Sequence, residues 1–276
     1  MKPYNIHETS PIAMFTSLWR NRHLILQMIR RDVSARYRGS LLGLTWSFIY
    51  PLLMLVVYTF VFSVVFKSRW STDAGESKTD FAILLFAGMI VFGLFSEGIN
   101  RAPGLIVSNV NYVKKVVFPL EILPLVSLGS VLFHSMVSVF VLLIMQVITN
   151  HILPWTIIFL PLVLLPLLFA SMGIGWLLAA LGVYVRDIGQ VTSVFTTALM
   201  FLSAVFYPVS ALPENYQNLI KLNPLVYIII EFRNVLILSI PPDWFVLGTA
   251  LISGLAIAAM GFWSFQKLRK GFADVI

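Results

Sequence analysis

The sequence predicts an all-α integral membrane protein whose 276 residues form a single transmembrane domain, residues 1–276. Two observations lead to this fold class. Only 11% of the residues are charged and 59% are hydrophobic, whereas soluble domains carry about 25% charged residues. Several uncharged runs are also long enough to cross a bilayer core, which needs about 20 apolar residues in a helix. We therefore expect six transmembrane helices joined by short loops.

Residues 1–40 should be a cytoplasmic segment with a helix that lies on the membrane surface. Residues 11–31 place apolar side chains near a 3.6-residue period, which is typical of an amphipathic interface helix. A soluble helix packed on a partner protein is the alternative. The segment is too polar for a cleaved signal peptide. Arginines gather just before the first long apolar run: Arg30, Arg31, Arg36 and Arg38.

The expected transmembrane helices are residues 41–66, 81–106, 122–148, 155–184, 188–208 and 244–265. Residues 122–185 contain no Asp, Glu, Lys or Arg, but one helix of that length would overrun a bilayer. A polar break therefore divides them, at Thr149, Asn150, His151 and Pro154. Pro161 and Pro166 should bend the helix that follows or precede its regular part.

Ser171, Gly175 and Ala179 repeat at four-residue spacing within the fourth segment. Small residues at this spacing favour close packing between membrane helices. We expect this face to pack within the subunit, with a dimer contact as the alternative.

The distribution of Lys and Arg predicts the orientation of the chain. Short basic segments stay on the cytoplasmic side of a membrane. Most of the 19 Lys and Arg residues fall in segments that the six-helix topology places inside. We therefore expect both termini in the cytoplasm of a multi-pass inner-membrane protein. Residues 67–80 should form an outside loop, and residues 107–121 and 184–190 should form inside loops.

Residues 209–242 do not fit a simple transmembrane helix. Their apolar run, residues 225–240, is short and contains Glu231 and Arg233. We expect short re-entrant or interfacial helices on the outside, between the fifth and sixth transmembrane helices. A further crossing here would place the basic residues after 265 outside, against the charge bias.

Several kinds of chemistry have no support in the sequence. It has no GxxxxGK[ST] phosphate-binding loop, no cysteine, and four histidines without metal-ligand spacing. We expect no catalytic residue, no bound metal and no nucleic acid partner. His134 lies within the third helix, either as a functional polar group or as a hydrogen-bonded packing residue. Glu97 and Arg101 stand one helical turn apart within the second helix and can form an ion pair.

Aromatic residues make up 14% of the chain, and many lie on the first and fifth helices. They can contact lipid and form interfacial belts. Alternatively, they line a conduit, because aromatic rings stack on the apolar faces of sugars. The candidate conduit residues are Trp46, Tyr50, Tyr58, Phe62, Phe66 and Tyr207.

Three ordered blocks of sequence resemble the permease subunits of ABC-2 type polysaccharide exporters, over nearly the whole chain. The first block is Arg31-Asp32, Arg36-Tyr37-Arg38-Gly39-Ser40, Leu42-Gly43, Trp46 and Pro51-Leu52. The second is Val113-Lys114-Lys115, Phe118-Pro119 and Leu123-Pro124. The third is Tyr184, Arg186-Asp187-Ile188, Tyr207-Pro208, Pro213, Asn223-Pro224 and Arg233. The pattern is most like the O-antigen (lipopolysaccharide) export branch, and exporters of capsule and teichoic acid share much of it.

The resemblance implies a homodimer joined to two separate ATPase subunits, which would bind ATP and Mg²⁺ and hydrolyse the ATP. This chain would then need no cofactor and would not itself be an enzyme. The cargo would be a polysaccharide linked to a polyprenyl pyrophosphate. The resemblance also implies that the inside loops contact the ATPase, through Asn111, Tyr112, Lys114, Lys115, Arg186 and Asp187.

Arg36, Tyr37 and Arg38 should lie at head-group depth, where the surface helix meets the first transmembrane helix. Arginine forks bind phosphate oxygens in a bidentate manner, so we expect the lipid-pyrophosphate cargo to enter here. The alternative is that these residues only anchor the helix and bind ordinary anionic lipid. Functions of other classes are a membrane glycosyl or acyl transferase and a structural membrane partner. The short loops leave little room for a transferase site.

Overall fold

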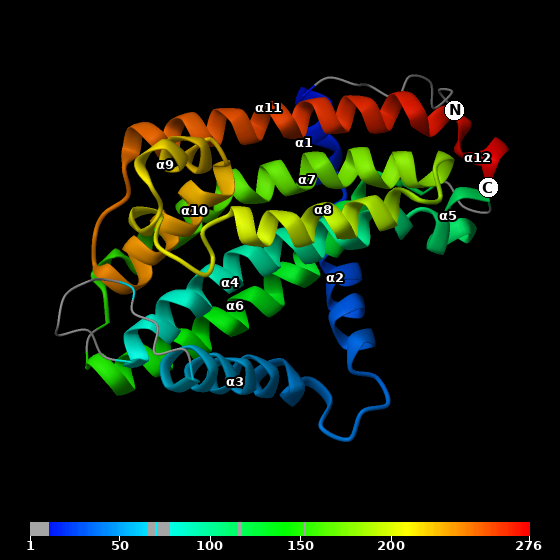
Figure 1. Ribbon diagram of the computed structural model, residues 1–276. Helices are drawn as coiled ribbons and strands as arrows, with labels where there is room; N and C mark the ends of the chain where they lie inside the picture. The colour runs from blue at the N-terminus through cyan, green and yellow to red at the C-terminus, as the bar shows by residue number, and fades with distance from the viewer. Residues whose placement is uncertain (1–10, 66–69, 71–77, 115–117, 152) are drawn as a thin grey trace.

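The computed structural model describes residues 11–65, 70, 78–114, 118–151 and 153–276, and none of these residues lies in a β-strand. The long α-helices run roughly along one direction (Figure 1): α3 (Trp46–Tyr58), α4 (Lys78–Arg101), α6 (Ile122–Asn150), α7 (Leu160–Tyr184), α8 (Ile188–Leu202) and α11 (Trp244–Leu268). The short α-helices are α1 (Pro11–Arg20), α2 (Arg22–Arg36), α5 (Val110–Lys114), α9 (Glu214–Lys221), α10 (Pro224–Arg233) and α12 (Phe272–Val275).

Irregular helical turns extend or join these helices. The 3₁₀ turns are η1 (Gly43–Thr45), η3 (Ala102–Gly104), η4 (Val107–Asn109), η5 (Trp155–Phe159), η6 (Val209–Ala211) and η8 (Arg269–Gly271). The π-helical turns are η2 (Thr59–Val65) and η7 (Asn234–Leu238). All the described elements are thus helical, which confirms the predicted all-α class.

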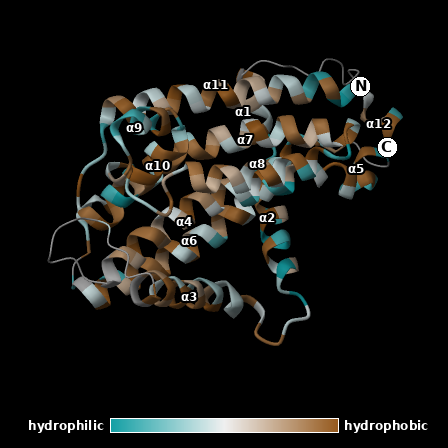
Figure 2. Ribbon diagram, in the orientation of Figure 1, coloured by the Kyte–Doolittle hydropathy of each residue, from teal (hydrophilic) through white to brown (hydrophobic). Residues whose placement is uncertain are grey.

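Five helical stretches in the described part of the chain are long and apolar enough to cross a membrane: Gly43–Phe62, Phe81–Gly104, Ile122–Thr149, Trp155–Tyr184 and Trp244–Val275. They overlap five of the six predicted segments. The predicted segment 188–208 differs, because α8 ends at Leu202 after 15 residues. Ala204 follows with a φ of 51°, a left-handed conformation that stops the helix. Figure 2 shows hydrophobic residues along the long helices and hydrophilic residues gathered on α2.

The predicted amphipathic helix over 11–31 is two helices, α1 and α2, which meet at Asn21. Figure 1 shows α2 running across the direction of α7 and α11. It buries Ile25, Met28 and Val33 and continues to Arg36. Gly39 and Gly43 then adopt φ values of 86° and 52° in the turn toward α3. Glycine reaches this left-handed region without steric cost, which explains its presence in the turn.

The break between α6 and α7 lies where the polar residues predicted it. His151 ends α6 with a φ of 54°, and η5 starts at Trp155. Pro161 stands in the first turn of α7, where its missing N–H costs nothing, and Pro166 lies inside the helix.

Helices α7 and α11 approach each other through glycines. A Cβ atom added to Gly173 would overlap the carbonyl of Ile257 and lie 2.7 Å from the Cα of Ala258. A Cβ on Gly261 would overlap the backbone of Gly173 in turn. The predicted stripe of Ser171, Gly175 and Ala179 is buried. The closest backbone approach therefore lies on the neighbouring Gly173, because that residue faces α11.

The 209–242 region forms α9, α10 and η7 at the end of the molecule opposite α5 and α12 (Figure 1). Asn223 caps α10 by accepting a hydrogen bond from the Leu225 N–H. Arg233 is buried and donates to the backbone oxygens of Leu84, Ala204 and Val205. This guanidinium joins α10 to α4 and to the turn that ends α8.

We predict that Gly173→Ala destabilises the protein by about 1–3 kcal/mol, because overpacking a tight contact forces the two backbones apart. Gly248→Ala on α11 is the matched control, since no heavy atom lies within 4 Å of its added Cβ. The control should be neutral or stabilising, because alanine favours the helix over glycine. Thermal unfolding in detergent, followed by tryptophan fluorescence, measures both. Equal melting temperatures for the two variants would contradict the close approach.

Candidate functional site

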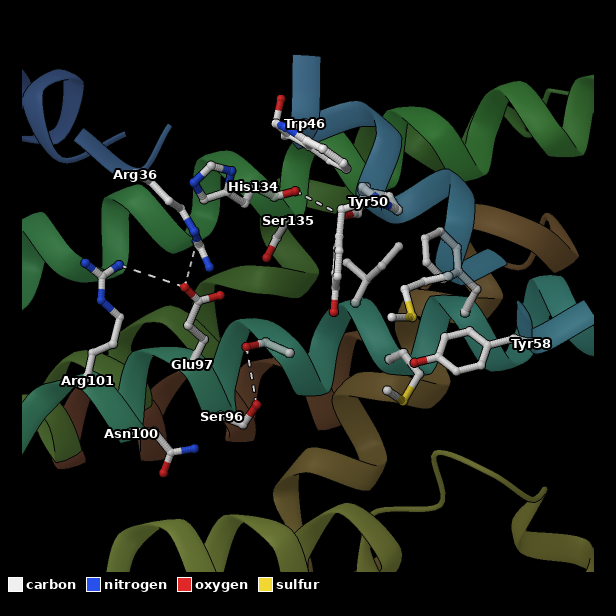
Figure 3. A pocket seen from close by; sticks show the side chains of 18 of the residues that line it. Arg36, Trp46, Tyr50, Tyr58, Ser96, Glu97, Asn100, Arg101, His134 and Ser135 are labelled. Atoms are coloured by element: carbon white, nitrogen blue, oxygen red, sulfur yellow. Dashed lines mark hydrogen bonds and ion pairs between the residues drawn. The ribbon is translucent and has the colours of Figure 1, made fainter. Parts of the chain in front are cut away.

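A cavity of about 710 Å³ lies between α3 on one side and α4 and α6 on the other (Figure 3). The α2 end and α3 contribute Arg36, Tyr37, Trp46, Ser47, Tyr50, Pro51, Met54 and Tyr58. The α4 lining is Phe86, Met89, Ile90, Gly93, Ser96, Glu97, Asn100 and Arg101, and the α6 lining is His134, Ser135 and Ser138. The cavity therefore collects most of the polar side chains of α4 together with the aromatic residues of α3.

Two arginines and two carboxylates meet at one end of the cavity. Arg36 Nη1 lies 2.8 Å from Glu97 Oε1, and Arg101 Nη2 lies 2.9 Å from Asp32 Oδ2. The predicted pair within α4 is present but longer, since Arg101 Nη1 lies 3.9 Å from Glu97 Oε1. Both short pairs join α2 to α4, so these charges connect the end of α2 to one end of the cavity. Figure 3 shows Arg36, Glu97 and Arg101 facing one another.

Tyr37 and His134 form a second link, which joins the end of α2 to α6. The Tyr37 hydroxyl lies 3.2 Å from His134 Nδ1, and the two rings meet edge to face at 5.5 Å. Burial raises the pKa of Tyr37, although Arg36 opposes that shift, so the phenol stays protonated at neutral pH. His134, left open between a functional and a packing role, is thus a hydrogen-bonded residue in the cavity wall.

The aromatic wall of the cavity contains three of the predicted conduit residues. Trp46, Tyr50 and Tyr58 recur at helical spacing on α3 and all line the cavity. Phe62 is not among the lining residues, and its ring stacks on Phe81 with the centroids 5.8 Å apart.

The remaining two conduit candidates lie elsewhere. Tyr207 does not line the cavity either, since it follows the turn after α8 and donates to the backbone oxygen of Phe201. Phe66 lies outside the described residues.

The polar stripe of α4 was missed in the sequence, apart from Glu97 and Arg101. Gly93, Ser96 and Asn100 join them on the cavity side. Their spacing of three and four residues is the period of one helix face, so a search for polar periodicity within 81–106 would have found them. The Asn100 amide donates to Thr196 Oγ1 at 3.0 Å, which ties α4 to α8. Asp32, which forms the shorter ion pair with Arg101, was not among the predicted site residues.

The residues predicted to contact an ATPase lie near one end of the molecule, around α5 and the start of α8 (Figure 1). Asn111 and Lys114 are exposed on α5, and Arg186 and Asp187 are exposed in the turn before α8. Lys115 lies outside the described residues.

Tyr112 differs from its neighbours on α5, because it is half-buried and packed. Its ring stacks on Phe118 at 4.4 Å, and its hydroxyl accepts a hydrogen bond from Arg31. The hydrogen bond from Arg31 links α5 to α2.

Within the described part of the chain, no three His, Asp or Glu side chains are grouped so that they could hold a metal ion. The cavity offers guanidinium and carboxylate groups at one end and tyrosine and tryptophan rings along its wall. This arrangement can offer a ligand charged groups at one end and aromatic ring faces along the rest.

Comparison with known proteins shows similar chains among polysaccharide export systems. The chain is 26% identical over 271 residues to the O-antigen export system permease protein RfbA of Myxococcus xanthus, covering 96% of this chain and 100% of that one. It is 22% identical to the RfbA of Klebsiella pneumoniae over 92% and 95% of the two chains. It is 25% identical to the polysialic acid transport protein KpsM of Escherichia coli over 72% and 75%.

The sequence profile of the ABC-2 type transporter family matches residues 23–237. This match runs from α2 through the cavity-forming helices to η7, which confirms the resemblance read from the sequence blocks. The chain therefore belongs to the ABC-2 type transporter membrane family.

Proposed function

We propose that the chain is the permease subunit of an ATP-driven exporter that moves a lipid-pyrophosphate-linked, O-antigen-like polysaccharide across the cytoplasmic membrane. The observation that carries this proposal is the cavity, which joins an arginine-containing end to an aromatic wall in a chain similar along its length to O-antigen export permeases. The similarity to capsule export proteins leaves a capsular polysaccharide as the second cargo.

The charged end of the cavity suits the pyrophosphate head group. Arg36 and Glu97 keep 44% and 34% of their side-chain surface exposed, and ion pairs this exposed contribute roughly 0–1 kcal/mol. A pyrophosphate carries more negative charge than one carboxylate, and a guanidinium binds its oxygens in a bidentate manner. The head group therefore displaces Glu97 from Arg36 as it binds, which makes Arg36 a reversible binding residue. Arg38 is exposed nearby and adds positive charge outside the cavity.

The aromatic wall suits the glycan. Trp46, Tyr50 and Tyr58 present ring faces along α3, and stacking on sugar rings does not depend on one hydroxyl pattern. Such a wall lets successive sugars pass without tight binding to any one of them.

Energy has to come from a second protein in this proposal. The chain has no phosphate-binding loop of the GxxxxGK[ST] type, so ATP and Mg²⁺ would bind to separate ATPase subunits. Asn111, Lys114, Arg186 and Asp187 are exposed at one end of the bundle and form the proposed contact with those subunits.

A second copy of the chain completes the conduit in this proposal. Only 17% of the apolar span Gly43–Phe62 is buried within the subunit, compared with 72% of Phe81–Gly104. The aromatic wall of the cavity belongs to this weakly packed span. A symmetric partner that packs against α3 would cover the open face, since closed two-fold dimers are the commonest oligomers.

The proposal includes six crossings with both termini in the cytoplasm. The 15 residues of α8 span only about 22 Å, less than a bilayer core of about 30 Å. In this proposal, the rest of the bilayer thickness is covered on the outside by the non-helical residues 203–208 and by the short helices α9 and α10. The excess of Lys and Arg in the proposed inside segments supports this orientation.

We predict that Arg36→Lys lowers the affinity for the lipid-linked glycan about tenfold, because loss of one forked hydrogen bond to a charged group costs roughly 1.5 kcal/mol. Export in cells that lack the native gene, and glycan-stimulated ATP hydrolysis in proteoliposomes, measure the effect. Arg22→Lys is the matched control, since Arg22 does not line the cavity and instead contacts Trp19 of α1. Arg38→Lys tests the outer arginine in the same assays. Unchanged export by both the Arg36 and Arg38 variants would place the head-group site elsewhere.

We predict that a single cysteine at Val56 forms a disulfide between two copies of the chain. Val56 is 65% exposed on α3, and the chain has no native cysteine to interfere. Ile252, which is 70% exposed on α11, is the control position, and a cysteine there should form no disulfide-linked dimer. Dimer formation is read on a non-reducing gel. A dimer at the control position, together with none at several exposed α3 positions, would contradict the proposed interface.

A reporter fused after Ile276 should signal a cytoplasmic location, because six crossings return the chain to its starting side. A second reporter inserted after Tyr216, in the exposed part of α9, should signal the outside. Paired alkaline phosphatase and fluorescent protein fusions measure the two sides. An outside signal after Ile276 would mean that residues 209–242 contain a further crossing.

A further inference from the structure

The segment Arg269–Ile276 lies beside α5 and is also tied to the end of α7. Lys114 Nζ on α5 donates to the backbone oxygen of Ile276 at 2.7 Å. The Tyr184 hydroxyl, at the end of α7, donates to the backbone oxygen of Leu268 at 2.7 Å. Figure 1 shows α12 next to α5 at this end of the molecule. Segments far apart in the sequence thus share one surface.

A buried ion pair fixes where this segment starts. Arg269 Nη1 lies 2.6 Å from Glu121 Oε2, with 15% and 7% of the two side chains exposed. Arg269 Nη2 also donates to the backbone oxygen of Phe118, and Ser17 Oγ donates to Glu121 Oε1. Removing one partner of a buried ion pair leaves an uncompensated charge, so this contact strongly constrains the segment.

Packing orders the rest of the segment. Phe272 is 1% exposed, and its ring meets Phe265 at 5.6 Å and Tyr184 at 6.1 Å. Ala273, Asp274 and Val275 face outward on the other side of α12. The segment therefore has one anchored face and one free face, next to the exposed residues of α5.

The exposed charges around this surface are mainly positive. The cations are Arg31, which donates to Tyr112 of α5, Lys114, Arg186 and Lys270, and the acids are Asp187 and Asp274. A protein partner with an excess of acidic side chains would complement this surface.

We propose that Arg269–Ile276, α5 and the 184–187 turn form one continuous docking surface for the ATP-hydrolysing subunit, and that the Glu121–Arg269 ion pair holds it in place. This inference rests on the proposed function, which supplies the ATPase, and it adds a third segment to the two inside loops. Arg269 and Glu121 act as positioning residues, because they are buried behind the surface and do not face the partner.

The test places single cysteines in the complete transporter purified with its ATPase subunit. Ala273→Cys and Asn111→Cys are each treated with a short bifunctional thiol reagent, against ATPase that carries single cysteines on its permease-facing side. Met260→Cys, exposed on α11, is the control and should give no product. We expect both test positions to crosslink to the ATPase.

The two proposals fail in different ways. A product at Asn111 without one at Ala273 would overturn the added segment and leave the proposed function intact. Absence of product at both would contradict the ATPase contact itself and with it the proposed coupling. A product at Ala273 alone would also overturn the single continuous surface.

Variants of the buried pair test the positioning role. Arg269→Gln should lower the crosslinking yield at Ala273 roughly fivefold relative to that at Asn111, because the unpaired Glu121 releases the segment. Arg269→Lys keeps the charge and should restore much of the yield. Lys267→Gln is the control, because Lys267 is exposed on α11 outside the docking segment, where its Nζ lies over the Trp263 ring. Comparing yields within one preparation separates loss of position from loss of protein. If Arg269→Gln and Lys267→Gln give the same yield ratio, the ion pair does not hold the surface.

Discussion

The structure depends on one constraint, which is that a charge or backbone group taken out of water must find its partner inside the protein. Arg233 shows the constraint most directly. Arg233 is 4% exposed, and the hydrogen-bond acceptors of its guanidinium are backbone oxygens, those of Leu84, Ala204 and Val205. Ala204 and Val205 lie in the non-helical turn after α8, where a buried carbonyl oxygen needs a partner. The buried cation satisfies these carbonyls and holds the turn that ends α8 against α10 and α4.

The same constraint explains the arrangement at the other end of the molecule. Asp32, Arg36, Glu97 and Arg101 pair across α2 and α4, and Glu121 pairs with Arg269. Each pair joins elements that are distant in the sequence, namely α2 with α4 and the 269–276 segment with the residue before α6. The Arg36–Glu97 pair is the more exposed and contributes little stability. The buried Glu121–Arg269 pair is suited to a permanent structural role.

Much of the fold followed from composition and periodicity, because membrane-spanning helices need long uncharged runs. Polar residues and prolines in the sequence also predicted the break at residues 149–154 and the short helices in 209–242. The end of α8 at Leu202 was not visible, since Tyr207-Pro208 marked the next obvious break. That helix stops early because Ala204 turns into the left-handed region, where distant Arg233 binds its carbonyl oxygen. Local sequence carries no record of such a distant partner.

The sequence by itself determined the all-α membrane class and placed the aromatic residues Trp46, Tyr50 and Tyr58 on one helix, since both depend on short-range patterns. Only the tertiary structure decided which side chains share the cavity and which charges pair. Glu97 was expected to pair with Arg101 within its own helix, yet its shorter ion pair is with Arg36 of α2. Phe62 shares the helix of the cavity aromatics but stacks outside the cavity. The ion pairs and the set of cavity-lining residues depend on how whole helices pack against one another. Contacts between residues far apart in the sequence decide that packing.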